Sequence, residues 1–252
     1  MGKIIVVHSF RGGTGKTNIL ANTATCIAMK GKKVGIVDTD IQSPGIHVLF
    51  GFEPENIKRS LNDYLWGKCS INDAVYDVTA GLTDVETSGG KMYLLASSMN
   101  LGEITKILKE GYEVSLLNDG LTEMMNKLNL DFLFIDTHPG IGEETLLSLA
   151  ISDVSIIILR PDSQDYQGTK ITVDVCRRLG VQNLYLVLNK VIPTYDFAKI
   201  RQDIERVYNC PVATILPLSE DITENASKKI FYLANRDHPF SKGIEEIASK
   251  IL

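Results

Sequence analysis

The sequence predicts an α/β fold, a doubly wound and mostly parallel β-sheet with helices on both faces. Short apolar runs alternate along the 252 residues with longer stretches of helical periodicity, which is the pattern of successive β-α-β units. Most of these runs are continuously apolar, as expected of strands that are covered on both faces. A glycine-rich segment, "GGTG" at 12–15, follows the first run and precedes a helical stretch.

Each element follows from these patterns in turn. We expect strands at residues 3–9, 33–39, 91–97, 131–137, 154–160, 183–190 and 212–217. We expect helices near residues 16–30, 60–77, 113–129, 142–151, 166–179, 196–208, 221–234 and 241–252. Gly31 and Gly180 lie where the first and fifth of these helices would end, because glycine is favoured just past a helix C-terminus. Residues 78–90 predict a surface loop, and no repeat or linker divides the chain, so we expect one domain over 1–252.

Composition and charge exclude several classes of protein. The formal net charge is −5, so contact with nucleic acid would need a local basic patch. The four cysteines are widely spaced and form no C-x-x-C pair, which favours a reducing compartment and gives no support for a zinc or iron–sulfur site. No apolar run approaches the roughly 18 residues that a membrane span needs. We therefore expect a cytoplasmic protein.

The segment "SFRGGTGKTN", residues 9–18, resembles a phosphate-binding loop. Gly15, Lys16 and Thr17 match the second half of the pattern G-x-x-x-x-G-K-[ST], although Phe10 occupies the position of its leading glycine. Lys16 is expected to bridge the β- and γ-phosphates and to act in catalysis, and the Thr17 hydroxyl is expected to bind Mg²⁺. The predicted nucleotide-binding residues of this loop are Gly12, Gly13, Thr14, Gly15, Lys16, Thr17 and Asn18.

Acidic residues follow two of the predicted strands. Asp136 ends the apolar run of "LFIDTHPG" and is predicted to hold the metal beside the loop, although a strand-end aspartate can also cap the next helix. Asp38 and Asp40 follow another strand, in "IVDTDIQSPG". One of them can hold the Mg²⁺ shell, predicted as Asp38, while the other, predicted as the catalytic Asp40, orients or deprotonates an attacking water. The alternative is a solvated acidic turn.

Taken together, these motifs resemble the MinD/ParA family of P-loop ATPases, whose Walker A motif is deviant. The matching stretches are "GGTGKT" (12–17), "VDTDIQSPG" (37–45), "FIDTHPG" (134–140), "LVLNK" (186–190) and residues 60–78. The resemblance covers nearly the whole chain and implies a P-loop NTPase fold that binds ATP or ADP with Mg²⁺. It also implies slow ATP hydrolysis, a homodimer formed on ATP binding, and a protein partner that stimulates hydrolysis and is positioned or regulated in cell division, partitioning or cargo positioning.

In that family, a signature lysine before the glycine pair reaches the phosphates of the partner subunit. Arg11 occupies this position here. Arginine is planar and prefers bidentate phosphate contacts, so the exchange is not conservative. One interpretation is that Arg11 crosses the dimer and stabilises charge on the transferring phosphoryl group. The other is that Arg11 only packs locally or meets an acidic neighbour, and the dimer is altered or lost.

The resemblance also places the adenine base. It implies that Asn189 hydrogen-bonds the adenine edge and that Pro217 and Leu218 border the base. An asparagine at a strand end can equally be a turn residue.

The C-terminal helix and two basic pairs indicate whether the chain resembles membrane-binding or DNA-binding members of the family. The helix near 241–252 places its apolar residues on one face and carries a polar face of mixed charge, which favours core packing over a membrane-targeting role. That apolar face consists of Ile244, Ile247, Ala248 and Ile251. The basic pairs at 177–178 and 228–229 make DNA binding possible without indicating it.

A second class of function stays open. It is a metabolic P-loop enzyme, or an ATPase of metallocofactor assembly, that uses ATP to activate a substrate or partner. The double glycine with a cation at position 11 favours the dimerisation switch. Cluster-carrying relatives use cysteines near the loop that here follows Asp136, or at the C-terminus. No cysteine lies between Cys69 and Cys176 in this chain, so that loop has no such ligand.

Overall fold

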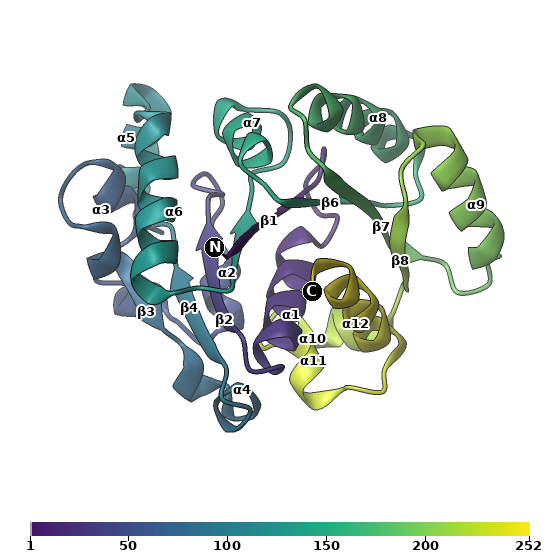
Figure 1. Ribbon diagram of the computed structural model, residues 1–252, viewed down its shortest axis with the longest axis horizontal. Coiled ribbons are helices and arrows are strands. Elements are labelled where there is room, and N and C mark those ends of the chain that lie inside the picture. Colours follow the sequence, from purple (N-terminus) through teal and green to yellow (C-terminus); the bar gives the residue numbers. More distant parts are fainter. Residues whose placement is uncertain (1) are drawn as a thin grey trace.

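The structure is a computed structural model that describes residues 2–252. Its strands are β1 (Lys3–His8), β2 (Lys33–Asp38), β3 (Val75–Asp77), β4 (Lys91–Leu95), β5 (Phe132–Asp136), β6 (Val154–Leu159), β7 (Asn183–Val191) and β8 (Val212–Pro217). They form an eight-stranded sheet with the order β3-β4-β2-β5-β1-β6-β7-β8 (Figure 1). All neighbouring pairs are parallel except β3 with β4. The carboxyl ends of seven strands therefore meet at one edge, where ligands of such folds bind.

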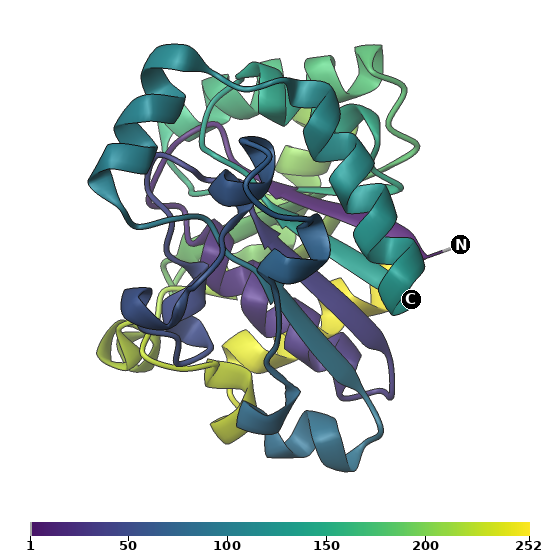
Figure 2. The same cartoon turned by 90° about the vertical axis from the view of Figure 1, so that its left-hand side faces the viewer.

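The sheet is covered on both faces. The helices are α1 (Lys16–Ala28), α2 (Ile46–Leu49), α3 (Leu61–Leu65), α4 (Thr83–Thr87), α5 (Leu101–Glu110), α6 (Val114–Leu128), α7 (Glu143–Ala150), α8 (Ser163–Arg178), α9 (Phe197–Tyr208), α10 (Glu220–Asn225), α11 (Phe231–Ala234) and α12 (Pro239–Ile251). Short 3-10 turns occupy 54–56, 71–74 and 79–81. Helices α1, α11 and α12 bury their apolar residues against one face, and α6, α8 and α9 against the other. Figure 2 looks onto the β3–β4 end, with α6 on one side of the strands and α1 on the other.

Successive residues of the central strands point into two different cores. On β1, Ile5 and Val7 join the core beneath α1 and α12, whereas Val6 joins the core beneath α6 and α8. On β5, Phe134 and Ile135 divide in the same way. This alternation explains the continuously apolar runs, because neither face of these strands meets water. The predicted doubly wound α/β fold and its seven parallel strands are confirmed.

The largest error of the sequence prediction concerns residues 60–77. The expected helix is wrong: α3 covers only Leu61–Leu65, and the segment then passes through a 3-10 turn into the antiparallel edge strand β3. Two capping boxes, at Ser60 and Ser70, each start a new short element. Gly67 has a φ of +67°, a left-handed conformation that a helix interior does not allow. Turn chemistry therefore overrode helical periodicity here.

Other boundaries also differ from expectation. Residues 78–90 contain a 3-10 turn and α4, and they bury Val78, Leu82 and Val85, so they are more than a surface loop. Helix α5 was not predicted. The helix expected over 221–234 is two short helices, because Ala226 and Ser227 both take positive φ values, +48° and +56°.

The helix ends and the C-terminal helix follow the prediction. Gly31 and Gly180 take φ values of +77° and +79°, and their amides donate to carbonyls of the preceding helical turn. The apolar face of α12 is buried in the core, with exposed fractions of 0–1% for Ile244, Ile247, Ala248 and Ile251. Within residues 2–252, no helix combines the length and the apolar character that crossing a membrane would need.

Candidate functional site

The phosphate loop lies at the carboxyl edge of the sheet, between the end of β1 and the first turn of α1. Gly13 and Gly15 have φ values of +75° and +92°, which only glycine adopts without strain. A Cβ atom on Gly15 would also lie 2.5 Å from Nδ2 of Asn189. The loop borders a cavity of about 250 Å³. The cavity is lined by Ser9, Gly12, Gly13, Thr14, Gly15, Lys16, Thr17, Asn18, Asp40, Ser43 and Pro139.

Lys16, Thr17 and Asp136 are brought together as the sequence predicts. Nζ of Lys16 lies 3.0 Å from Oδ1 of Asp136, and the Thr17 hydroxyl donates to Oδ2 of the same carboxylate at 2.7 Å. The parallel pairing of β1 with β5 places Val7 beside Asp136, so the carboxylate arrives directly under the loop. Burial raises the pKa of Asp136, while Lys16 and Thr17 counter that rise.

These residues fit a nucleotide-bound Mg²⁺. A hydroxyl and a carboxylate oxygen 2.7 Å apart are the hard oxygen donors that Mg²⁺ selects. Thr17 and Asp136 would hold the ion together with phosphate oxygens. Lys16 is 6% exposed and pairs with Asp136, so the site already balances charge before a ligand arrives.

Asp38 organises the loop that follows β2. Its side chain is fully buried, and Oδ1 accepts from the backbone amide of Asp40 at 3.0 Å. Oδ2 accepts from the amides of Gly45 at 3.1 Å and Ile46 at 3.4 Å. Burial, and then the charges of Asp136 and Asp40, raise the pKa of Asp38 to about 8. Both oxygens thus serve the backbone, and a role of Asp38 in the metal shell stays a prediction.

Asp40 lines the cavity and has partners that the sequence analysis missed. Its Oδ1 accepts from the amide and the hydroxyl of Ser43, both at 3.1 Å, and lies 2.7 Å from Nδ1 of His138. The solvated acidic turn is therefore not what the structure shows, because Asp40 is 8% exposed. The signal for His138 was available: it follows Asp136 at the same distance as Asp40 follows Asp38.

Arg11 lies at the rim of the site and contacts acidic residues of its own chain. Its Nη1 is 3.4 Å from Oδ1 of Asp162 and 3.4 Å from Oδ1 of Asp165, at the start of α8. The Arg11 side chain is 38% exposed, whereas that of Asp165 is 2% exposed. Of the two interpretations of Arg11, the single chain therefore shows the pairing with acidic neighbours. Its reach into a partner's site stays a prediction.

Two residues at the end of β7 shape the phosphate loop from the other side. Nδ2 of Asn189 donates to the Thr14 carbonyl at 2.8 Å, and Nζ of Lys190 donates to the Gly13 carbonyl at 2.9 Å. In a trans peptide, the carbonyl and the following amide point in opposite directions. The amides of Thr14 and Gly15 therefore point away from β7 and are left for an anion. Lys190 was not predicted, and Asn189 was expected at the adenine edge or as a turn residue.

The remaining predicted residues lie around this site. Pro217 ends β8, and Leu218 is 50% exposed while its amide donates to the Val191 carbonyl at 2.8 Å. The side-chain Nδ2 of Asn18 donates to the Ser227 hydroxyl at 2.7 Å, which connects α1 to the turn after α10. Contacts of Pro217, Leu218, Asn189 and Asn18 with a nucleotide stay predictions.

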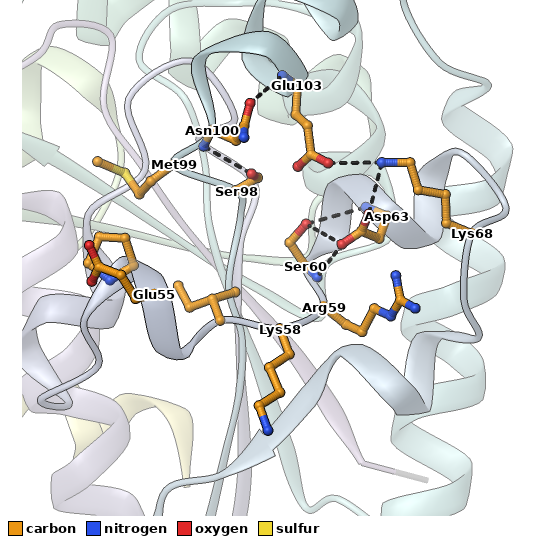
Figure 3. A pocket seen from close by; sticks show the side chains of 12 residues that line it. Glu55, Lys58, Arg59, Ser60, Asp63, Lys68, Ser98, Met99, Asn100 and Glu103 are labelled. Carbon is orange, nitrogen blue, oxygen red and sulfur yellow. Dashed lines mark hydrogen bonds and ion pairs between the residues drawn. The ribbon is translucent and has the colours of Figure 1, made fainter.

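A second and larger hollow lies between residues 54–60, α3 and the start of α5 (Figure 3). Its volume is about 590 Å³. Lys68 bridges Asp63 and Glu103 across it, at 3.0 and 2.8 Å. The lining contains three acidic and three basic side chains, so its charges balance. It has no glycine-rich loop and no buried cation, and the phosphate loop is the better candidate site.

The fold and this site together define a nucleotide-binding protein of the P-loop NTPase class, and comparison with known proteins agrees. A family model described as an AAA domain matches residues 2–197. An uncharacterized ATP-binding protein of Methanocaldococcus jannaschii is 27% identical over 254 residues, covering 100% of this chain and 88% of the relative. The iron–sulfur cluster carrier protein of Aquifex aeolicus is 25% identical over 260 residues, covering 97% of this chain and 66% of the relative.

The solved structures agree on the fold. The septum site-determining protein MinD of Pyrococcus horikoshii, complexed with Mg-ADP, matches with a TM-score of 0.79 at 19% identity, covering 100% of this chain and 96% of that one. The chain belongs to the MinD/ParA family of P-loop ATPases. The resemblance identified from the motifs is thereby confirmed.

Proposed function

We propose that the protein binds and slowly hydrolyses ATP, and that ATP brings two copies together as a switch that positions or regulates a protein partner. The observation that carries this proposal is the cluster beneath the glycine loop of buried Lys16 and Asp136 with half-buried Thr17. We also propose that residues 1–252 act as one ATPase domain.

In this proposal the loop residues 12–18 hold the phosphates, and Lys16 shifts from Asp136 toward the β- and γ-phosphates. The water oxygen forms a bond to the γ-phosphorus while the bond from that phosphorus to the bridging oxygen breaks, which leaves ADP and phosphate. Asp40 orients the water, because its carboxylate lines the same cavity. Mg²⁺ bound with the nucleotide supplies neutralisation of the phosphate charge. Asn189, Pro217 and Leu218 border the base.

The dimer part of the proposal depends on Arg11. Its side chain is 38% exposed at the rim of the site and is held by two ion pairs of 3.4 Å. Exposed pairs of this kind contribute about 0–1 kcal/mol, so a triphosphate across a dimer interface can replace them. In the dimer, Arg11 would stabilise the charge that develops on the partner's γ-phosphate.

The test is the solution mass by light scattering without nucleotide, with ADP and with ATP. We expect Asp40→Ala to stay dimeric in saturating ATP, because it binds ATP and cannot position the water. The wild type should return to the monomer as ATP is consumed. A monomeric Asp40→Ala protein in saturating ATP contradicts the dimer switch. An absence of ATP binding contradicts the whole proposal.

A second candidate is a carrier of a metal cluster, supported by the similarity to the Aquifex aeolicus iron–sulfur cluster carrier. The cysteines weigh against it: Cys26, Cys176 and Cys210 are buried, and Cys69 is half-buried. Within the described residues, no group of three or more histidine, cysteine or acidic side chains is arranged to hold a metal ion. Visible absorption after incubation with iron and sulfide, lost on replacement of Cys69, would favour this candidate.

A further inference from the structure

We propose that His138 is a positioning residue for ATP hydrolysis: it holds Asp40 by one carboxylate oxygen and leaves the other free to orient the attacking water. This inference rests on the proposed function and deepens it, since it gives a role to a residue that the proposed function leaves without one. It starts from the contact between Nδ1 of His138 and Oδ1 of Asp40, 2.7 Å long.

The sheet register brings the two residues together. Strands β2 and β5 are parallel neighbours, and Asp38 pairs with Asp136 at their carboxyl ends. Asp40 and His138 each follow two residues later. Thr39 fixes this arrangement, because its amide and its hydroxyl both donate to the Asp136 carbonyl, at 2.9 and 2.8 Å. The loops after both strands therefore leave the sheet at the same register position, and the contact between Asp40 and His138 is a consequence of the fold.

All the contacts of the Asp40 carboxylate fall on one oxygen. Oδ1 accepts from the amide and hydroxyl of Ser43, and a carboxylate can accept from His138 only if Nδ1 carries a hydrogen. Oδ2 has no hydrogen-bond partner among residues 2–252. The Asp40 side chain is 12% exposed and borders the phosphate-loop cavity. Three donors thus fix the plane of the carboxylate, and Oδ2 remains for a water in the cavity.

His138 also links Asp40 to the loop that follows β5. The next residue, Pro139, lines the cavity, and the Gly140 amide donates to the Ser9 carbonyl at the start of the phosphate loop, at 3.2 Å. Gly140 has a φ of +88°, so the turn that carries His138 depends on glycine. The backbone that carries His138 is thereby tied to the start of the phosphate loop.

A purely structural role is the competing explanation, in which the pair only ties two loops together. The two roles differ in what they do to ATP binding. Loss of a loop tie loosens the site, so it weakens ATP binding and lowers the rate together. Loss of a positioning contact lowers the turnover number and leaves ATP affinity unchanged. Asparagine supplies the comparison, because its amide Nδ2 can donate from nearly the position of the histidine Nδ1.

The experiment measures phosphate release and ATP affinity for the wild type, His138→Ala, His138→Asn, Asp40→Asn and the double variant His138→Ala/Asp40→Asn. We expect His138→Ala to lower kcat about 10-fold or more, since small misplacements of a catalytic group cost up to about 100-fold. Its ATP affinity should stay within about 2-fold, and His138→Asn should recover most of the rate. In the Asp40→Asn background, loss of His138 should have no further effect, because the two residues act as a unit.

Three results would overturn the inference. They are wild-type kcat in His138→Ala, equal loss in His138→Ala and His138→Asn, or an additive effect in the double variant. Failure of the proposed function is a separate outcome. In that case the wild type releases no phosphate, or Asp40→Asn turns over as fast as the wild type, whatever His138 does.

Discussion

The two ends of the phosphate loop hold their cations in opposite ways. Lys16, at the helix end, has a side chain that is 7% exposed and a single buried partner, Asp136, at 3.0 Å. Arg11, at the strand end, is 38% exposed and meets two carboxylates at the longer distance of 3.4 Å. A buried pair is costly to break, whereas an exposed one contributes little. The comparison indicates that Lys16 is built into the site and Arg11 is held in a releasable position.

The partners of Arg11 support this distinction. Asp165 is almost fully buried, yet it also accepts from the backbone amide and the guanidinium Nε of Arg160, at 2.9 and 3.0 Å. Asp162 caps α8 through the amides of Gln164 and Asp165. Both carboxylates therefore keep their other hydrogen bonds when Arg11 leaves, so no buried charge is left without a partner.

The largest effect is expected at Lys16. Lys16→Ala should weaken ATP binding by about 100-fold or more, because the loop loses its one buried cation. It should also destabilise the fold by about 3–5 kcal/mol, since Asp136 is left buried and unpaired. The measurements are ATP titration by calorimetry and urea denaturation.

A double variant separates the two losses. In Lys16→Ala/Asp136→Asn the buried charge is gone, so stability should largely return while ATP binding should not. Full ATP affinity in Lys16→Ala would contradict the distinction between a Lys16 that is built into the site and an Arg11 that can be released.

Arg11 should affect assembly rather than nucleotide binding. Arg11→Ala is expected to keep ATP affinity within about 3-fold and stability within about 1 kcal/mol, as for an exposed pair. The dimer seen by light scattering in the ATP-bound Asp40→Ala background should weaken by about 10-fold or more, because a charge-assisted phosphate contact is lost. Arg11→Lys is the matched control and should restore part of the dimer. A tight dimer in Arg11→Ala would show that Arg11 acts only within its own chain.

Acid should act at the buried end of the loop through His8. His8 ends β1 directly before the loop, and burial, followed by the charges of Lys16 and His138, lowers the pKa of His8 to about 3. The folded state therefore keeps His8 neutral, while the unfolded chain protonates it below about 6.5. Its stabilising contribution is complete above that pH and is lost as the pH falls toward 3, by up to about 1.4 kcal/mol per unit.

The check is urea denaturation at pH 7, 6 and 5 for the wild type, His8→Gln and Arg11→Ala. Relative to the wild type, His8→Gln should gain stability as the pH falls, because glutamine does not titrate. Asp38, whose pKa is raised to about 8, acts in the opposite direction and does so equally in both proteins. Arg11→Ala should follow the wild type. Identical slopes in all three proteins would mean that His8 contributes nothing to the acid response.

The parallel sheet and the phosphate loop were predictable because both depend on local patterns. Continuously apolar runs mark strands that are buried on two faces, and the glycine–lysine–threonine run needs only a strand before it and a helix after it. Residues 60–90 and helix α5 were not predictable in this way. There, capping boxes at Ser60 and Ser70 and a left-handed Gly67 compete with helical periodicity, and the edge strand β3 depends on its pairing with β4.

Within the site, the sequence indicates which residues take part, but it does not indicate which side chains they contact. Lys16, Thr17 and Asp136 carry a motif, and they meet as expected. The pairs that Arg11 and Asp40 form, with α8 and with His138, depend on the sheet order and on the register of β2 and β5. Those contacts span about one hundred residues or more of sequence, and no local pattern encodes them.

The contacts of β7 with the phosphate loop have a consequence for how the protein is made. Asn189 and Lys190 hold the Thr14 and Gly13 carbonyls across 175 and 177 residues of sequence. During synthesis the N-terminal loop leaves the ribosome long before these two residues do. Contacts of such long range form late, so we expect the nucleotide site to form only after Asn189 and Lys190 have been made. Until then, a chain with a complete glycine–lysine–threonine motif has no rigid pocket for a triphosphate.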